Sequence, residues 1–409
     1  MSVDVVRSVP AVEVAPPSRN GVLFVGAAAA VALGLAVLSV AGGRTLLLYA
    51  FGLAFGLVLF HSRFGFTSGW RQLVAVGQGR ALRTHMLMLA VACTLFSVVL
   101  GTGVGLAAAP QGFIQPVGYG LVIGSFLFGV GMQLGGSCAS GTLYAVGSGH
   151  TAIVLTLGGF IIGSMLAILS FPFWSSVPQG AKVSFADTPL RYPGALGISL
   201  LLIVAVVGIS LLVQRRRDPP PVEEPPRAAG LARILRGSWP LWVGALALAG
   251  LNAATLWASG TPWGITSAFG LWGSKWLAGV GVDVSGWAYW QVPANATSLT
   301  NSVLADKTSV MDFGIIIGAL IASAAAGAFV LHRKVPLKLG VGAVLGGILM
   351  GYGARIAGGC NIGAYFSGIA SFSLHGWVWG AVAIVGTVAG LALRPLFGLR
   401  NPRPADSVC

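Results

Sequence analysis

The sequence has very little charge. Only 8% of its 409 residues are Asp, Glu, Lys or Arg, whereas 56% are hydrophobic. A soluble domain with so few charged residues would not stay dispersed. Apolar runs of about 20 residues, the length that crosses a bilayer core as a helix, recur along the chain. The composition therefore excludes an ordinary soluble protein and predicts an all-α, polytopic membrane protein surrounded by lipid.

The sequence also lacks the patterns of several common functional sites. Its five histidines are scattered and have no metal-ligand spacing. No phosphate-binding loop of the Walker A type and no dinucleotide fingerprint occurs. The net charge of +14 comes from basic residues between apolar runs, where cytoplasmic loops of membrane proteins collect them. We therefore expect no cofactor, no metal ion, no nucleic-acid partner and no catalytic residues.

Cysteine is scarce, with four residues and no CxxC pair. Cys93 lies inside an apolar run, where a cysteine usually packs as a small apolar side chain. Cys409 ends the chain in a context that does not match a prenylation signal. The other two, Cys138 and Cys360, each lie in a glycine-rich interruption of an apolar run.

The apolar runs predict about ten spanning helices. The first run is longer than the core of a signal peptide, so we expect it to be retained. The runs lie at about 21–40, 45–60, 84–108, 117–135, 150–171, 194–213, 239–257, 311–331, 338–357 and 374–393. The predicted organisation is a cytoplasmic tail (1–20), a first membrane half (21–213), a Pro- and Arg-rich cytoplasmic linker (214–237), a second membrane half (238–393) and a cytoplasmic tail (394–409).

The two cysteine-bearing interruptions match each other without a gap. Laid over each other, GMQLGGSCASG and GYGARIAGGCNIGA place Gly131 on Gly353 and Cys138 on Cys360. Most of the Lys and Arg residues fall on one side if both termini are cytoplasmic, as the positive-inside rule requires. The runs that precede the two motifs then cross the membrane in opposite directions. This predicts an inverted-topology repeat, which in transporters places the site at the repeat interface.

A second pair of matching stretches supports the duplication. RFGFTSG (63–69) and PWGITSA (262–268) share Gly-x-Thr-Ser. The segments that follow them, 69–83 and 269–310, are too interrupted to span a membrane. We expect short or re-entrant helices there, since irregular backbone at membrane depth occurs where it lines a cavity or is buried in protein.

The glycine pairs predict that each helix ends and a new one begins at the cysteine. Free backbone N–H groups at a new helix start attract anions. Alternatively, the glycines only allow helices to pack closely and the cysteines fill space. A cysteine in apolar surroundings stays a neutral S–H, a weak and soft donor that suits the terminal sulfur of a small sulfur oxyanion. Nearby hydroxyl and amide groups, such as those of Ser140 and Thr142, suit harder oxygens.

The candidate substrate path is the set of residues at the two interruptions and the two Thr-Ser pairs. Carboxylates, which usually line cation paths, are absent from it. Its members are Gln133, Gly136, Ser137, Cys138, Gly141, Arg355, Gly358, Gly359, Cys360, Asn361, Gly363, Thr67, Ser68, Thr266 and Ser267.

Arg355 is the charged residue of this set, and Gln133 is its counterpart in the aligned motif. An arginine within a span is costly and is therefore a functional candidate. It either attracts or gates the substrate, or it snorkels or binds backbone carbonyls as a structural group.

With GGSCASG, AGGCNIGA, RFGFTSG and PWGITSA, the chain resembles the YeeE/YedE family of sulfur-transport membrane proteins from about residue 45 to 393. The resemblance implies uptake of thiosulfate or a related sulfur compound across the bacterial plasma membrane. It also implies that Cys138 and Cys360 line the path and relay the ion through S–H···S contacts. Some members have a further path cysteine near the first re-entrant segment, where this chain has Thr67 and Ser68. Family members often work beside a small cytoplasmic sulfur-carrier protein, and some are tied to selenium metabolism.

Two other classes of function remain open from the sequence. A membrane thiol oxidoreductase would exchange a Cys138–Cys360 disulfide, but no CxxC, quinone or flavin signature accompanies these cysteines. A soft-metal transporter would use thiols for Cu(I), but no Met or His partner stands beside them in the sequence. No carboxylate within the spans suggests a proton carrier, since Asp312 lies at one end of its apolar run, so facilitated diffusion pulled by cytoplasmic consumption and symport both remain open.

Overall fold

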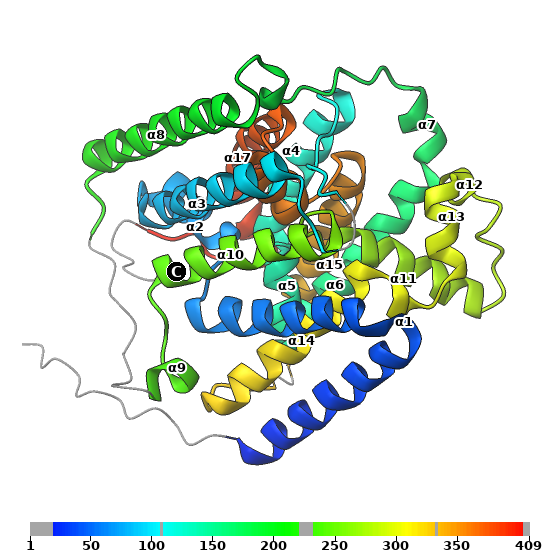
Figure 1. Cartoon of the computed structure of the whole chain (residues 1–409). Helices are drawn as coiled ribbons and strands as arrows, with labels where there is room; N and C mark the ends of the chain where they lie inside the picture. Colours follow the sequence, from blue (N-terminus) through cyan, green and yellow to red (C-terminus); the bar gives the residue numbers. More distant parts are fainter. Residues whose placement is uncertain (1–18, 107–108, 221–231, 332–333, 404–409) are drawn as a thin grey trace, which may run out of the picture.

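The computed structural model describes residues 19–106, 109–220, 232–331 and 334–403 as a set of packed helices (Figure 1). Within these ranges extended backbone pairs only in two isolated bridges. The longer helices are α1 (Asn20–Ser62), α3 (Arg80–Thr102), α4 (Tyr119–Gly135), α6 (Thr151–Leu169), α8 (Arg191–Arg217), α10 (Leu241–Ser259), α14 (Lys307–Ala325), α15 (Leu337–Ile356) and α17 (Leu374–Leu393). The shorter ones are α2 (Phe66–Val76), α5 (Ala139–Gly147), α7 (Phe171–Ser176), α9 (Ala232–Arg236), α11 (Thr266–Gly279), α12 (Ala288–Gln291), α13 (Pro293–Thr300), α16 (Gly368–Ala370), three 3₁₀ turns (Phe185–Asp187, Val303–Ala305, Arg394–Phe397) and one π-helical segment (Asn361–Ser367).

Over the described residues, nine helical stretches are long and apolar enough to cross a membrane, where the sequence predicted about ten. The difference lies in α1, which joins the runs 21–40 and 45–60 across a break at Gly42. Gly42 has φ 77°, a backbone conformation that glycine adopts without steric cost. The two arms of α1 therefore diverge sharply, as Figure 1 shows. The prediction of a multi-pass, all-α membrane protein is confirmed.

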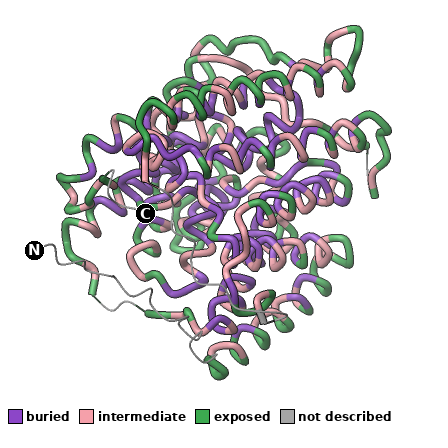
Figure 2. Tube along the Cα trace, turned by 90° about the vertical axis from the view of Figure 1, so that its left-hand side faces the viewer, coloured by how far each residue is buried: buried purple, intermediate pink, exposed green. Residues whose placement is uncertain are grey.

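The surface agrees with a lipid environment. α8 and the first arm of α1 carry large apolar side chains that are mostly exposed, such as Phe24, Leu201 and Val204. Exposed residues are concentrated on the outer helices, whereas buried ones fill the interior (Figure 2). Apolar surface on this scale marks contact with lipid or a partner.

The linker expected at 214–237 is partly helical. α8 continues to Arg217, and α9 forms directly before the second membrane half. Both segments are rich in arginine, which has a high helix propensity. The prolines of the linker lie within 219–226, of which residues 221–231 are outside the described residues, as are 1–18 and 404–409 of the tails.

The short helices expected after the two Thr-Ser pairs are present. α2 begins at Phe66, one residue before its Thr-Ser pair, and α11 begins at Thr266, the first residue of its pair. Both are shorter than a bilayer-crossing helix, with 11 and 14 residues.

The two halves exchange packing partners in a matched way. α4 packs antiparallel on α15, because Gly124 meets Gly353 while Gly131 meets Gly346. α6 packs on α15 as α17 packs on α4, and α1 packs on α14 as α10 packs on α3. In each comparison, exchanging the two halves converts one pair of helices into the other. The helix packing therefore has the pattern of an inverted repeat, related by a pseudo-two-fold axis.

Candidate functional site

The first cysteine lies where the α4 span is interrupted. α4 ends at Gly135, and Gly136 turns the chain with φ 79°. Cys138 then caps α5, and its carbonyl accepts hydrogen bonds from the backbone N–H and the hydroxyl of Thr142, at 2.7 and 2.8 Å. The Cys138 thiol is buried and lies 3.5 Å from the hydroxyl of Ser140.

The path residues next to Cys138 reach the molecular surface. Gly136 is exposed and Ser137 is partly exposed, although the thiol between them and α5 is buried. The hydroxyls of Ser137 and Thr142 lie 2.8 Å apart. This break therefore joins the molecular surface to a buried thiol.

The second cysteine lies at the equivalent interruption after α15. Gly358 has φ 73° and Gly359 has φ 150°, both in the region that glycine favours. Cys360 then caps a π-helical segment, and its carbonyl accepts from the N–H of Ala364 at 2.8 Å and of Tyr365 at 3.3 Å. Single π-helical turns occur often at functional sites, because they redirect side chains within a helix.

The two cysteines adopt the same backbone conformation. Cys138 has φ −92° and ψ −173°, and Cys360 has φ −100° and ψ −167°. Each follows a left-handed glycine and starts a new helical segment. Both apolar runs end at the glycines and restart directly after the cysteine: α5 begins at Ala139, where a restart near Ser140 was expected, and the π-helical segment begins at Asn361, where a restart after Asn361 was expected.

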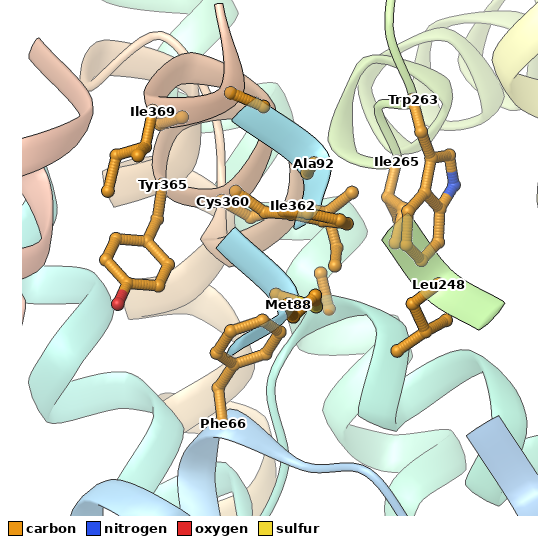
Figure 3. Close-up of a cluster of buried hydrophobic side chains, with 14 of the residues drawn as sticks. Phe66, Met88, Ala92, Leu248, Trp263, Ile265, Cys360, Ile362, Tyr365 and Ile369 are labelled. Atoms are coloured by element: carbon orange, nitrogen blue, oxygen red, sulfur yellow. The ribbon is translucent and has the colours of Figure 1, made fainter. Parts of the chain in front are cut away.

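Both thiols are buried and belong to one hydrophobic cluster. Figure 3 shows Cys360 and Ile362 at the centre of this cluster, between Tyr365 on one side and Trp263 on the other. The prediction that two distant motifs meet is consistent with this shared cluster.

Methionine side chains belong to the same buried cluster as the two thiols. Neighbours along the chain contain none, but folding brings four fully buried methionines from different helices into the same cluster, namely Met88, Met132, Met311 and Met350. The amide nitrogen of Asn361 lies 3.3 Å from the sulfur of Met132. Among the described residues, no group of three His, Cys, Asp or Glu side chains suits a metal ion.

Space remains beside Cys360. Gly363 is buried, yet a Cβ added there would meet no heavy atom within 4 Å. Its counterpart Gly141 is closely surrounded, because a Cβ there would lie 3.1 Å from the Cβ of Ser137 and 3.4 Å from the sulfur of Cys138. The interior is therefore more open at the second thiol than at the first.

The Thr-Ser pairs occupy unlike environments. Thr67 is buried and its hydroxyl has no partner, whereas the Ser68 hydroxyl lies 3.4 Å from the Gly65 carbonyl. Thr266 is partly buried. Ser267 is exposed and donates to Thr308 at 2.9 Å, so its hydroxyl turns to α14.

Gln133 and Arg355 also differ from each other. Gln133 is buried, its amide nitrogen lies 3.5 Å from the Thr67 carbonyl, and its amide oxygen has no partner. Arg355 is partly exposed, donates to the Tyr289 hydroxyl at 3.0 Å and lies over that ring, 4.9 Å from its centroid. The partly exposed position near the end of α15 agrees with snorkelling, and the printed partner is a side chain, Tyr289, instead of a backbone carbonyl.

Sequence reasoning missed one buried charged residue. Asp312 was placed at one end of its apolar run, but α14 begins earlier, at Lys307. Asp312 is therefore in the second turn, has no exposed surface, and neither carboxyl oxygen has a hydrogen-bond partner among the described residues. The helix start was readable from Asp306, an N-cap residue type directly before Lys307 and five residues before the apolar run.

Together the fold and the site define a polytopic membrane protein of two interlocked, inverted repeats, with broken helices meeting in the interior, an architecture shared by many secondary transporters. The chain belongs to the sulphur transport family, whose model matches residues 61–389.

Curated relatives agree along most of the chain. The protein is 31% identical over 355 residues to the thiosulfate transporter TsuA of Spirochaeta thermophila, covering 84% of this chain and 97% of the relative. It is 28% identical over 354 residues to the thiosulfate transporter TsuA of Escherichia coli, covering 82% and 90%. A shorter match, 33% over 141 residues and 34% of each chain, is to the probable transporter YedE of Escherichia coli. All three names describe transporters, which supports the prediction that the protein is not an enzyme.

Proposed function

We propose that the protein imports thiosulfate or a related sulfur-containing anion through a path that passes Cys138 and Cys360. The observation that carries this proposal is the pair of thiols at matching breaks, in one buried cluster, in a chain whose relatives are named thiosulfate transporters.

The chemistry of the cluster suits a soft anion. Neutral S–H groups donate weakly to a polarizable sulfur, and they do not repel an anion as thiolates would. Buried methionines belong to the same hydrophobic cluster and add no charge to it. Hydroxyls of Ser137 and Ser140 beside the first thiol supply donors for the harder oxygens.

The open space beside Gly363 supports passage at the second thiol. A transport path needs room for the ion next to the groups that bind it. Gly363 lies three residues after Cys360 in the π-helical segment, so an ion in that space would lie against the segment that Cys360 caps.

The proposed orientation places both termini in the cytoplasm of a bacterial cell, with the site in the plasma membrane. The support is the excess of Lys and Arg on one side of the predicted spans. In this orientation α15 ends toward the outside, so Arg355 stands on the side from which the anion arrives. The exposed Gly136 then faces the cytoplasm, where a small sulfur-carrier protein would receive the imported anion.

Uptake of labelled thiosulfate tests this function in cells without other thiosulfate importers. We expect Cys138→Ala and Cys360→Ala each to lower uptake about fivefold or more, since one lost hydrogen bond is worth about 1 kcal/mol. Cys93→Ala is the matched control, because the Cys93 thiol packs 3.6 Å from the Ile369 carbonyl between helices. Uptake by both path variants at the wild-type rate would reject the role of the thiols.

Two further measurements distinguish thiosulfate transport from the alternatives, which are a thiol oxidoreductase and a transporter of a selenium compound or a soft metal. A reversible Cys138–Cys360 disulfide during turnover, detected by mass spectrometry, would favour the oxidoreductase. Competition by selenite or Cu(I), with no effect of thiosulfate, would favour the other substrates.

A further inference from the structure

The buried carboxyl of Asp312 has no structural role that its surroundings explain. Its side chain is fully buried, and within the part of the chain that the structure describes neither of its oxygens has a hydrogen-bond partner. An unpaired ionised carboxylate in such a place is strongly disfavoured, whereas the neutral acid avoids most of that cost. Ionisable groups inside a membrane protein are by default functional candidates.

The repeat shows that packing does not require this carboxyl. Ile316 of α14 meets Gly147 through its carbonyl, and Cys93 of α3 meets Ile369, which is the residue that aligns with Gly147. Ile316 and Cys93 therefore occupy corresponding places in the two halves. Four positions before Ile316 in α14 is Asp312, and four positions before Cys93 in α3 is Leu89.

Leu89 is also fully buried. In both helices the preceding residue is a buried methionine, Met88 or Met311. The apolar side chain of Leu89 therefore fills this place in the first half. The second half has the acid Asp312 there, in spite of the free energy that burying a carboxyl costs.

Asp312 faces the candidate path. It shares a helix face with Thr308 and Ile316, four residues away on either side. Thr308 accepts a hydrogen bond from Ser267 at the start of α11, and Ile316 packs on α5, which begins at the first thiol. The carboxyl and the Cys360 thiol both lie in the buried interior, since neither residue has exposed surface.

Other charges around α14 leave the carboxyl uncompensated. Asp306 caps the helix by accepting from the N–H and hydroxyl of Ser309 at 2.7 Å, and it acts on Asp312 with a like charge. The ammonium of Lys307 turns instead to the loop at Ser259–Pro262. Titratable groups on the elements packed against α14 are Arg44, Tyr49 and His61 of α1, Cys138 and Tyr144 at α5, Arg233 and Arg236 of α9, Lys275 of α11, and Cys360.

We propose that Asp312 is a proton-binding site that couples inward movement of a proton to passage of the anion, a proposal that rests on the proposed function. An ionised Asp312 would repel an anion at Cys360, so the anion binds when the carboxyl carries its proton. Linkage is reciprocal, so the bound anion also holds the proton. The proton joins one carboxyl oxygen from the outer aqueous phase and leaves to the cytoplasm after the anion has departed. One cycle with a dianion then moves one proton and a net charge of −1.

Purified full-length protein in liposomes tests this coupling, with the membrane potential clamped at zero by potassium and valinomycin. An internal pH dye records protons while labelled thiosulfate is counted. For wild type we expect about one proton per anion, so that a gradient of one pH unit, acid outside, holds about a tenfold accumulation at equilibrium.

We expect Asp312→Asn, which keeps a neutral side chain of the same size, to move thiosulfate to equal concentrations without moving protons. Asp312→Glu should retain proton movement and so confirm that the carboxyl is the group required. The matched control is Asp283→Asn, because Asp283 is an exposed carboxyl outside the spans whose pKa is held below its usual range by the Ser285 hydroxyl.

The outcomes separate the two proposals. Wild-type uptake of thiosulfate without protons, or proton-coupled accumulation that persists in Asp312→Asn, would overturn the role of Asp312 and leave the transport function intact. If wild-type liposomes take up no thiosulfate, the proposed function fails and this inference fails with it.

Discussion

The backbones of Gly124 and Gly353 meet directly at the crossing of α4 and α15. A Cβ on either glycine would collide with the carbonyl oxygen of the other. The same relationship recurs between Gly131 and Gly346, which are the repeat counterparts of Gly353 and Gly124. This exchange is the signature of two-fold symmetry, in which residue i contacts j and the copy of j contacts the copy of i.

A side chain at this crossing should therefore destabilise the fold. We expect Gly124→Ala to lower stability by about 1–3 kcal/mol, the usual cost of overpacking. Gly250→Ala in α10 is the matched control, because a Cβ there meets nothing within 4 Å. Thermal unfolding of the detergent-purified protein compares the two. Equal melting temperatures for both variants would contradict the close packing of the repeats.

The thiols should be reached from opposite faces of the membrane. Gly136 beside Cys138 opens on the side proposed as cytoplasmic, and the Cys360 break belongs to the inverted copy. We expect a membrane-impermeant thiol reagent to modify Cys138 from inside in inverted vesicles and Cys360 from outside in intact cells. Thiosulfate should slow both reactions, and sulfate should have a smaller effect because it lacks a terminal sulfur. Modification of both thiols from one face only would contradict the inverted arrangement.

Gly363 should be sensitive in transport but tolerant in folding. Gly363→Ala adds a methyl group where no heavy atom lies within 4 Å, so we expect an unchanged melting temperature. If the space is part of the path, the methyl group narrows it and lowers thiosulfate uptake. The comparison is with Gly141→Ala. Its added Cβ would lie 3.1 Å from the Cβ of Ser137, so this variant should be less stable than wild type. Wild-type uptake by Gly363→Ala would place the path elsewhere.

Removing the charge of Arg355 should weaken capture of the anion. We expect Arg355→Gln to raise the KM for thiosulfate about fivefold at low salt, since a partly exposed charge contributes up to about 1 kcal/mol. The effect should shrink as ionic strength rises. Arg44→Gln removes an exposed arginine on the same proposed side and should leave the KM near the wild-type value. An Arg355→Gln effect on stability alone, with an unchanged KM, would make its bond to Tyr289 purely structural.

Much of this arrangement was predictable from local sequence. Gly136 and Gly358 marked the helix ends because glycine alone takes their left-handed conformation easily. The alignment of Cys138 with Cys360 then gave the repeat, and composition gave the membrane class.

The features that escaped prediction depend on contacts between distant segments. Met88 and Met350 enter the same buried cluster as the thiols only in the folded protein, and no local pattern predicts that. The isolation of Asp312 likewise depends on what surrounds it. The sequence predicted two separate spans, 21–40 and 45–60, on either side of Gly42. In the structure the helix continues on both sides of Gly42, which alone has a non-helical backbone conformation within α1.

A structure determined with thiosulfate bound, using anomalous scattering to locate sulfur, tests the central claim most directly. The account predicts a sulfur peak within contact distance of the Cys138 or Cys360 thiol, inside the cluster that both share. Thiosulfate bound away from both thiols, with the cluster unchanged, would contradict it.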